Sequence, residues 1–128
     1  MAEEGLTIQD VAGRTGLSVH TLRYYERIGL LDPVGRARNG HRRYAIADLA
    51  WIEFLQRLRA TGMPIRQMHR FAELRRLGRA SLAARRSLLA AHEEEVRLRL
   101  QELRRHLAAI EEKVEQYRIM EEEDDRDD

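Results

Sequence analysis

The sequence contains no cysteine, and this absence excludes a whole class of chemistry. Without thiols the chain can form neither a disulfide nor a thiolate metal site, and it cannot sense oxidants through a cysteine. No apolar run approaches the roughly 20 residues that a membrane-spanning helix requires. The amino terminus Met1-Ala2-Glu3-Glu4 also lacks the basic and apolar regions of a signal peptide. We therefore expect a cytoplasmic protein with no membrane partner.

The features of an enzyme are also missing. A chain of 128 residues suffices for one small core and an appendage, with little room for a separate catalytic domain. No nucleophile with a partnered base is recognisable. No two histidines are four residues apart among the five, which are His20, His41, His69, His92 and His106. The sequence predicts neither an enzyme nor a site for a metal or a cofactor.

The net charge of +1 conceals an unequal distribution of charge along the chain. Residues 1–80 carry 14 Arg and 8 acidic residues, about +6, whereas residues 81–128 carry 9 basic and 14 acidic residues, about −5. Positive charge gathered in one part of a chain is typical of a domain that binds a polyanion. A solvated basic surface has the same composition and is the alternative.

Residues 7–27 have the pattern of two short helices joined by a tight turn. Thr7 is a suitable N-cap, and Asp10 three residues later gives an acidic variant of the capping box. Gly16 interrupts the first helix, and Ser18 is a suitable cap for a second helix that runs to about Arg27. This arrangement is typical of a helix-turn-helix, although other helical hairpins share it.

Residues 32–44 are rich in turn residues and arginine. The Asn39-Gly40 pair is a strong signal for a hairpin. We expect a small two-stranded hairpin, or wing, that carries Arg36, Arg38, Arg42 and Arg43. Such a hairpin is marginal alone and must pack on the helices, which suits a module that lies along a phosphate backbone.

Two further helices are predicted from the spacing of apolar residues. The third should run from about Ala47 to Thr61, and the fourth should begin near Pro64 as its first residue. Gly78 then separates this compact unit from the rest of the chain. The apolar stripes predict core contacts by Leu49, Ile52, Leu55, Leu58, Ile65, Met68, Phe71 and Leu74.

From about Ser81 the sequence favours one long helix, because no glycine or proline occurs before Tyr117. Apolar residues recur there at alternating spacings of four and three, which is the seam of a coiled coil. Packing back on its own domain is the alternative, but so long a seam on so short a chain favours a homodimer. The predicted dimerisation residues are Leu89, Val96, Leu100, Leu103, Leu107, Ile110, Val114 and Tyr117. Extended towards the amino terminus, the seam also meets Glu93 and Arg86.

The predicted fold is therefore mainly α, with a winged helix-turn-helix domain and a small β-hairpin wing, followed by a long coiled-coil dimerisation helix. We expect residues 1–78 to form the first domain and residues 79–119 to form the dimerisation helix. Residues 120–128 should be a disordered acidic tail, because residues 121–128 contain seven acids and one arginine.

Three runs of residues carry a resemblance to a known family. They are Thr7-Ile8-x-x-Val11-Ala12-x-x-Thr15-Gly16-Leu17-Ser18, then Thr21-Leu22-Arg23-Tyr24-Tyr25-Glu26-Arg27-Ile28-Gly29-Leu30-Leu31, and then Asn39-Gly40-x-Arg42-Arg43-Tyr44. Together they resemble the MerR family of bacterial transcription regulators, and the likeness extends to about Tyr117. The run from Trp51 to Pro64 looks like the aldehyde- and thiol-stress branch of that family. The proposed sensor of that branch is a lone cysteine, which this chain lacks.

The resemblance implies a binding mode for double-stranded promoter DNA. The second helix would enter the major groove, the wings would grip flanking phosphates, and two copies joined by an antiparallel coiled coil would read a pseudo-palindrome. Arg23 would contact base edges or phosphate, with an intramolecular salt bridge as the alternative, and Tyr25 would contact the backbone or pack in the core. The predicted DNA-binding residues are Ser18, His20, Thr21, Arg23, Tyr24, Tyr25, Arg36, Arg38, His41, Arg42, Arg43, Tyr44 and Arg59.

The resemblance also implies a mechanism of regulation. The dimer would sit between the two promoter elements together with RNA polymerase, and an effector of unknown chemistry would make it bend and untwist the spacer. Deforming DNA costs several kcal/mol, so modest shifts between two dimer geometries could switch transcription. The alternatives are an architectural DNA-binding protein without an effector and a coiled-coil adaptor that has lost DNA binding.

Overall fold

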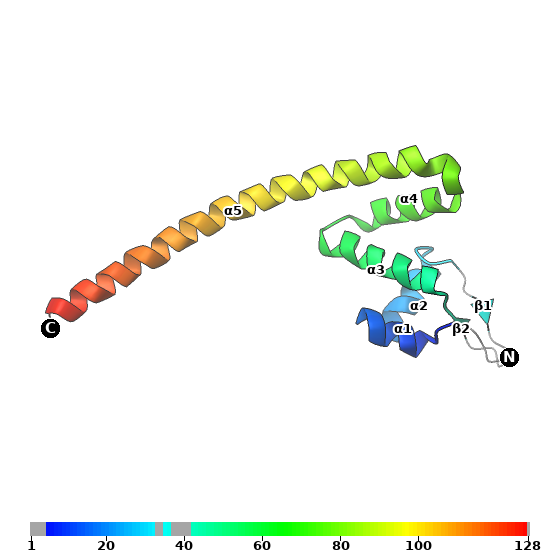
Figure 1. The fold of residues 1–128 in the computed structure, drawn as a ribbon, viewed down its shortest axis with the longest axis horizontal. Coiled ribbons are helices and arrows are strands. Elements are labelled where there is room, and N and C mark those ends of the chain that lie inside the picture. The colour runs from blue at the N-terminus through cyan, green and yellow to red at the C-terminus, as the bar shows by residue number, and fades with distance from the viewer. Residues whose placement is uncertain (1–4, 33–34, 37–41, 128) are drawn as a thin grey trace. The chain divides into compact units, whose positions relative to one another are not determined.

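The computed structural model describes residues 5–32, 35–36 and 42–127 and is mainly helical, as the sequence predicted (Figure 1). Contacts between residues divide the chain into two units, Met1–Leu88 and Leu89–Asp128. The elements in chain order are α1 (Ile8–Thr15), α2 (Val19–Arg27), β1 (Gly35–Arg36), β2 (Arg42–Arg43), α3 (Ile46–Ala60), α4 (Ile65–Arg76), the 3-10 helix η1 (Gly78–Ser81) and α5 (Leu82–Asp127).

Helices α1 and α2 begin at the residues that the sequence predicted. The Thr7 hydroxyl accepts a hydrogen bond from the Asp10 N–H at 3.0 Å, and the Asp10 carboxylate accepts one from the Thr7 N–H at 3.0 Å. Gly16 ends α1 with a φ of 77°, which favours glycine. Ser18 then caps α2. The helix-turn-helix geometry is therefore fixed by local chemistry at both helix starts.

The core of the first unit joins the helix-turn-helix to α3 and α4. Tyr25, Ile52 and Leu55 are fully buried. The Trp51 indole N–H donates to the Leu30 carbonyl at 2.9 Å, and the Trp51 ring stacks on the ring of Phe71 with centroids 5.7 Å apart. Burial of such side chains is worth about 1.5 to 3 kcal/mol each and holds α2 against the later helices.

Helices α3 and α4 differ slightly from the expected pattern. Leu49 is only half-buried and Ile65 is exposed, whereas the apolar spacing predicted both in the core. Pro64 is the N-cap of α4 rather than its first helical residue, because its ψ of 148° is extended. Ile65 is therefore in the first, solvent-facing position of the helix.

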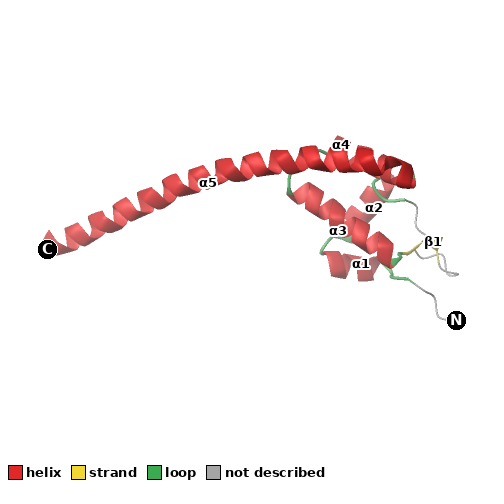
Figure 2. Ribbon diagram, turned by 45° about the horizontal axis from the view of Figure 1, so that its top comes forward, coloured by secondary structure: helices red, strands yellow, loops and turns green. Residues whose placement is uncertain are grey.

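Strands β1 and β2 are antiparallel and have two residues each. Figure 2 draws the strands in yellow and the helices in red. Tyr44, which follows β2, pairs with Leu6 through two backbone hydrogen bonds of 2.7 and 2.8 Å. A Cβ on Gly5 would lie 2.9 Å from the Tyr44 carbonyl oxygen, so this close approach requires glycine. Such short strands do not by themselves show the predicted hairpin wing, and residues 37–41 lie outside the described part of the chain.

Helix α5 has 46 residues, which corresponds to about 69 Å along its axis. It continues to Asp127, through most of the segment that we expected to be disordered. Arg118 contributes to this continuity, because it forms ion pairs with Glu115 and Glu122 one turn away on either side. Disorder of residues 120–128 in solution stays a prediction.

Candidate nucleic-acid interface

One exposed face of α2 gathers His20, Arg23, Tyr24 and Arg27. Their spacings of three, four and seven place them on one side of the helix, opposite the buried Tyr25. The guanidinium carbon of Arg27 lies 5.8 Å from the centre of the Tyr24 ring, which is a cation–π contact. This face presents guanidinium, imidazole and phenol groups, all of which can hydrogen-bond to phosphates or base edges.

Three of these four residues were predicted from the sequence as DNA-binding residues, and Arg27 was not. The signal for Arg27 was its spacing of three from Tyr24 and four from Arg23. Within the described residues Arg23 forms no ion pair, so nothing there supports the alternative of an intramolecular salt bridge.

Ser18 and Thr21 fix the start of this face. The Ser18 hydroxyl accepts from the Thr21 N–H at 3.0 Å, and the two hydroxyl oxygens are 2.9 Å apart. Ser18 is exposed and Thr21 is half-buried. Because the Ser18 side chain satisfies a free backbone donor, its first role is to position α2. Reading of bases by either hydroxyl stays a prediction.

Two contacts from α3 hold the helix-turn-helix in place. The Gln56 amide donates to the Thr15 carbonyl at 2.7 Å, beside the turn between α1 and α2. The guanidinium of Arg59 donates to the Tyr25 hydroxyl at 2.8 Å. Arg59, one of the predicted DNA-binding residues, is exposed, and this hydrogen bond places it directly beside α2. The Tyr25 ring is in the core, and its hydroxyl orients Arg59.

The predicted wing residues are only partly described. The backbones of Arg36 and Arg42 lie opposite each other in the β1–β2 pair. Arg43 is half-buried, and Tyr44 is buried rather than presented at the surface. The remaining two predicted wing residues, Arg38 and His41, lie outside the described residues. DNA contact by this segment stays a prediction.

Arg76 ties α4 to the loop that follows α2, a role that the sequence did not reveal. Its guanidinium donates to the Gly29 carbonyl and to the Asp32 carboxylate. Gly29 has a φ of 86°, and a Cβ there would lie 3.0 Å from the Nε2 atom of His69. The bond to Asp32 spans 44 positions of the sequence and the bond to Gly29 spans 47, so no local pattern signals them.

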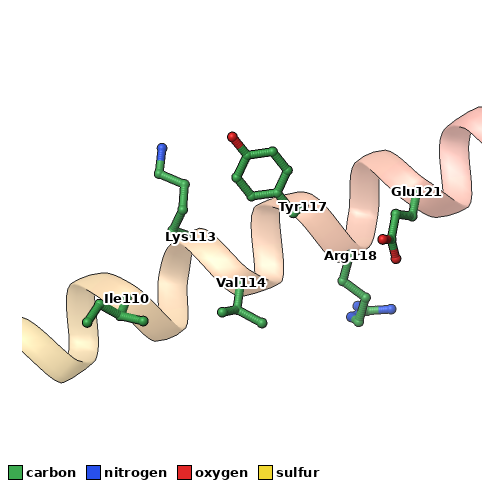
Figure 3. Close-up of a pocket in the computed structure, with 6 residues that line it drawn as sticks. All are labelled: Ile110, Lys113, Val114, Tyr117, Arg118 and Glu121. Carbon is green, nitrogen blue, oxygen red and sulfur yellow. The ribbon is translucent and has the colours of Figure 1, made fainter.

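The second unit carries a different kind of surface, a row of exposed apolar side chains along α5. Its members are Leu100, Leu103, Leu107, Ile110, Val114 and Tyr117, whereas Leu89 and Val96 are half-buried. Figure 3 shows the carboxyl-terminal part of the row, where Ile110, Val114 and Tyr117 line a shallow pocket. Charged side chains complete the lining of this pocket: Lys113, Arg118 and Glu121.

Ion pairs flank this apolar row. Hydrogen bonds from Arg118 lower the pKa of Glu115, and the same bonds raise the pKa of Arg118. Both groups therefore keep their charge over the physiological range. Among the residues that the structure describes, no group of three or more metal-ligating side chains is placed to hold an ion. None of the helices there is long and apolar enough to cross a membrane.

Comparison with known proteins places this chain in a family of regulators. Residues 6–74 match the model of the MerR HTH family regulatory protein. An uncharacterized HTH-type transcriptional regulator of Haemophilus influenzae is 38% identical over 111 residues, which is 87% of this chain and 82% of that protein. The chain therefore belongs to the MerR family of helix-turn-helix regulatory proteins. These relatives are transcriptional regulators rather than enzymes, as the sequence predicted.

Two solved structures are similar over most of their length. HiNmlR, a MerR family regulator lacking the sensor domain and bound to promoter DNA, has a TM-score of 0.81 and 36% identity, covering 90% of this chain and 91% of that chain. A MerR family transcriptional regulator from Listeria monocytogenes has a TM-score of 0.83 and 34% identity, covering 88% and 86%. These likenesses confirm a MerR-type fold with a long carboxyl-terminal helix.

Proposed function

We propose that this protein is a transcription regulator that binds double-stranded promoter DNA in a sequence-specific way, with α2 in the major groove. The observation that carries this proposal is the exposed α2 face formed by His20, Arg23, Tyr24 and Arg27. The excess of arginine in residues 1–80 supports it, since phosphate neutralisation dominates affinity for DNA. The similarity to HiNmlR, which was solved bound to promoter DNA, supports it further.

We assign different roles to the residues within this interface. Arg23, near the middle of the exposed face, reads base edges or grips phosphate, and His20 reads bases from the first turn. Arg59 holds a phosphate beside the same helix, and its hydrogen bond to the Tyr25 hydroxyl keeps the guanidinium oriented. The hairpin of β1 and β2 acts as a wing along the phosphate backbone, with the predicted arginines on it.

The same proposal includes a homodimer formed through α5. Residues 1–78 form the DNA-binding domain and residues 79–119 form the dimerisation helix. The exposed apolar row of α5 supports this assignment, because contact with a second copy would remove these side chains from water. Two copies paired antiparallel would read a pseudo-palindromic operator in the bacterial cytoplasm, in the presence of RNA polymerase, and would distort the spacer DNA.

Footprinting on the promoters near its own gene tests this function. A sequence-specific regulator should give a bounded footprint between the two promoter elements, whereas an architectural protein would spread along the DNA. Substitution of Arg23 by alanine should lower the specific affinity by about 1 to 3 kcal/mol if this residue reads a base edge. Wild-type affinity in that variant, or binding that spreads without a boundary, would contradict the proposal.

A further inference from the structure

We propose that Arg76 of α4 is a positioning residue for DNA recognition. It holds the carboxyl-terminal end of α2 and so sets how the exposed face of that helix meets the major groove, without itself contacting DNA. The inference rests on the proposed sequence-specific binding and deepens it, because it names a side chain outside the interface on which that binding depends.

Two consecutive backbone carbonyls after α2 are held by side chains from two different helices. The indole N–H of Trp51 in α3 donates to the Leu30 carbonyl at 2.9 Å. The guanidinium Nη2 atom of Arg76 in α4 donates to the Gly29 carbonyl. Both carbonyls follow closely on Arg27, the last residue of α2. We call this pair of contacts the carbonyl clamp.

The backbone after α2 connects the carbonyl clamp firmly to the helix. The N–H groups of residues 28–31 all donate back to carbonyls of residues 24–26, so this segment continues the helix rather than forming a hinge. The side chains of Leu30 and Leu31 are buried, which fixes the segment further. A shift of either clamped carbonyl should therefore shift the end of α2.

Arg76 is suited to this role by the fork of donors on its guanidinium. While Nη2 binds the Gly29 carbonyl, Nε donates to the Asp32 carboxylate, so one side chain spans the whole segment. Its positive charge also offsets the partial negative charge at the end of α2. The side chains of Arg76 and Asp32 are 35% and 54% exposed, and ion pairs so open to solvent add little stability. We therefore expect the contact to matter more for geometry than for folding.

A second side chain of α4 lies against the same segment. His69 is seven residues before Arg76 and thus on the same side of the helix. A Cβ on Gly29 would lie 3.0 Å from the Nε2 atom of His69, whose Nδ1 atom is 2.9 Å from the Glu73 carboxylate. Gly29 therefore has the His69 ring close to its Cα and Arg76 on its carbonyl, which restricts movement of the end of α2.

The other contacts that hold α2 come from α3. Gln56 holds the turn before α2, and Arg59 is bonded to the middle of the helix. Arg76 thus supplies from α4 the hold on the far end of the helix. It is also the member of the carbonyl clamp that can be changed without disturbing the core, because Trp51 is buried whereas Arg76 is at the surface.

Titrations of Arg76→Ala with two DNA fragments test this role. One is the fragment that footprinting near the protein's own gene defines, and the other has a random sequence. Affinity for the first should fall about tenfold and affinity for the second should change by less than about twofold, because α2 is misplaced while the phosphate contacts remain. The slope of log affinity against log salt concentration should stay as in wild type. Arg79→Ala is the matched control, since Arg79 is an exposed arginine of η1 with the same charge, and it should discriminate as wild type does.

Three outcomes would overturn the proposal. If Arg76→Ala lowered both affinities alike and reduced the salt slope by about one unit, Arg76 would be a phosphate ligand. Unchanged discrimination in Arg76→Ala would contradict positioning, and so would an equal loss in Arg79→Ala. Circular dichroism at the titration temperature checks folding. If Arg76→Ala does not fold, Arg76→Lys takes its place, because lysine keeps the charge but not the fork. It should lose about threefold in discrimination, and wild-type discrimination in the folded lysine variant would refute the proposal.

A double-mutant cycle with Arg23→Ala gives an independent test. Because Arg76 acts through α2, its substitution should cost less specific affinity in an Arg23→Ala background than in wild type. Losses that multiply fully would show that Arg76 acts independently of the exposed α2 face, which would contradict the proposal. A wild-type protein that binds both fragments equally would instead refute the sequence-specific binding on which the inference rests.

Discussion

Replacing Leu103 and Leu107 by glutamate should convert the proposed dimer into monomers. These leucines are 65% and 51% exposed in the single chain. Full burial of a leucine is worth about 1.5 to 3 kcal/mol. Burying the part that is still exposed should therefore contribute about 1 to 2 kcal/mol for Leu103 and about 0.8 to 1.5 kcal/mol for Leu107. A dimer contains each residue twice, which gives a loss of about 3.5 to 7 kcal/mol before the cost of burying carboxylates. The dissociation constant should therefore rise at least about 300-fold.

Sedimentation velocity at micromolar concentration measures this change. The matched control is Leu98→Glu, because Leu98 is 56% exposed but lies off the stripe on the outward face of α5. It introduces the same charge and should leave the dimer intact. Thermal unfolding should show that the first unit stays folded in all variants. If the double variant dimerises as tightly as wild type, or if wild type is monomeric, the assignment of this stripe to dimerisation is wrong.

Three further predictions concern DNA contact, the first helix and signal input. Arg59→Ala should weaken specific and non-specific DNA binding alike, and it should reduce the slope of log affinity against log salt concentration by about one unit. Arg57→Ala, on the opposite side of α3, should leave that slope unchanged. Equal slopes for the two variants in titrations from low to high salt would contradict this. Thr7→Ala should destabilise the protein to urea by about 1 kcal/mol. The hydrogen bond from the Thr7 N–H lowers the pKa of Asp10, so this part of the stability is present above the usual carboxyl pKa and is lost as the pH falls through the lowered one. Asp10→Asn should remove that pH dependence. If the stability of this variant to urea fell between neutral and acidic pH as much as that of wild type, the assignment to Asp10 would be wrong. Operator affinity and promoter output should not respond to thiol alkylators, diamide or low-micromolar mercury, because the chain has no cysteine; a reproducible response of the purified protein would show another sensing chemistry.

The first two helices could be placed from the sequence because their starts depend on neighbouring residues. Thr7 with Asp10, and Ser18 with Thr21, are capping pairs three positions apart. The start of α3 was harder to place, because Ala45 has no side-chain acceptor. Only the reverse half of the motif is present, in which the Asp48 carboxylate accepts from the Ala45 N–H at 2.8 Å.

The polar contacts that position the candidate interface could not be predicted in the same way. Periodicity tells which side of a helix is buried, but not which polar groups meet across the core. The bond from Arg59 to Tyr25 joins residues 34 positions apart, and the bond from Gln56 to Thr15 joins residues 41 positions apart. The sequence therefore predicted Arg59 as a ligand for DNA without showing what orients it.

For the long helix, the apolar stripe could be predicted from the sequence but the end of the helix could not. The spacing of apolar residues predicted the stripe, and its members from Leu100 to Tyr117 are exposed on α5. The expected end of the helix at residue 119 rested on the acidic composition of the residues that follow. The helix runs further because nothing in residues 118–127 breaks it and because Arg118 bridges two carboxylates in adjacent turns.

The connection from α4 to α5 is held by hydrogen bonds of the first unit. Carbonyl groups at the end of a helix lack partners within it, and here the next helix supplies them. The buried Ser81 hydroxyl donates to the Leu74 carbonyl, and Arg85 donates to the Gly78 carbonyl at 2.7 Å and to the Ser81 hydroxyl at 3.0 Å. Arg76, two residues before Gly78, is in turn bonded to the loop after α2. Because all these residues belong to the first unit, the first turns of α5 are connected to the loop after α2 through hydrogen bonds rather than through a flexible linker.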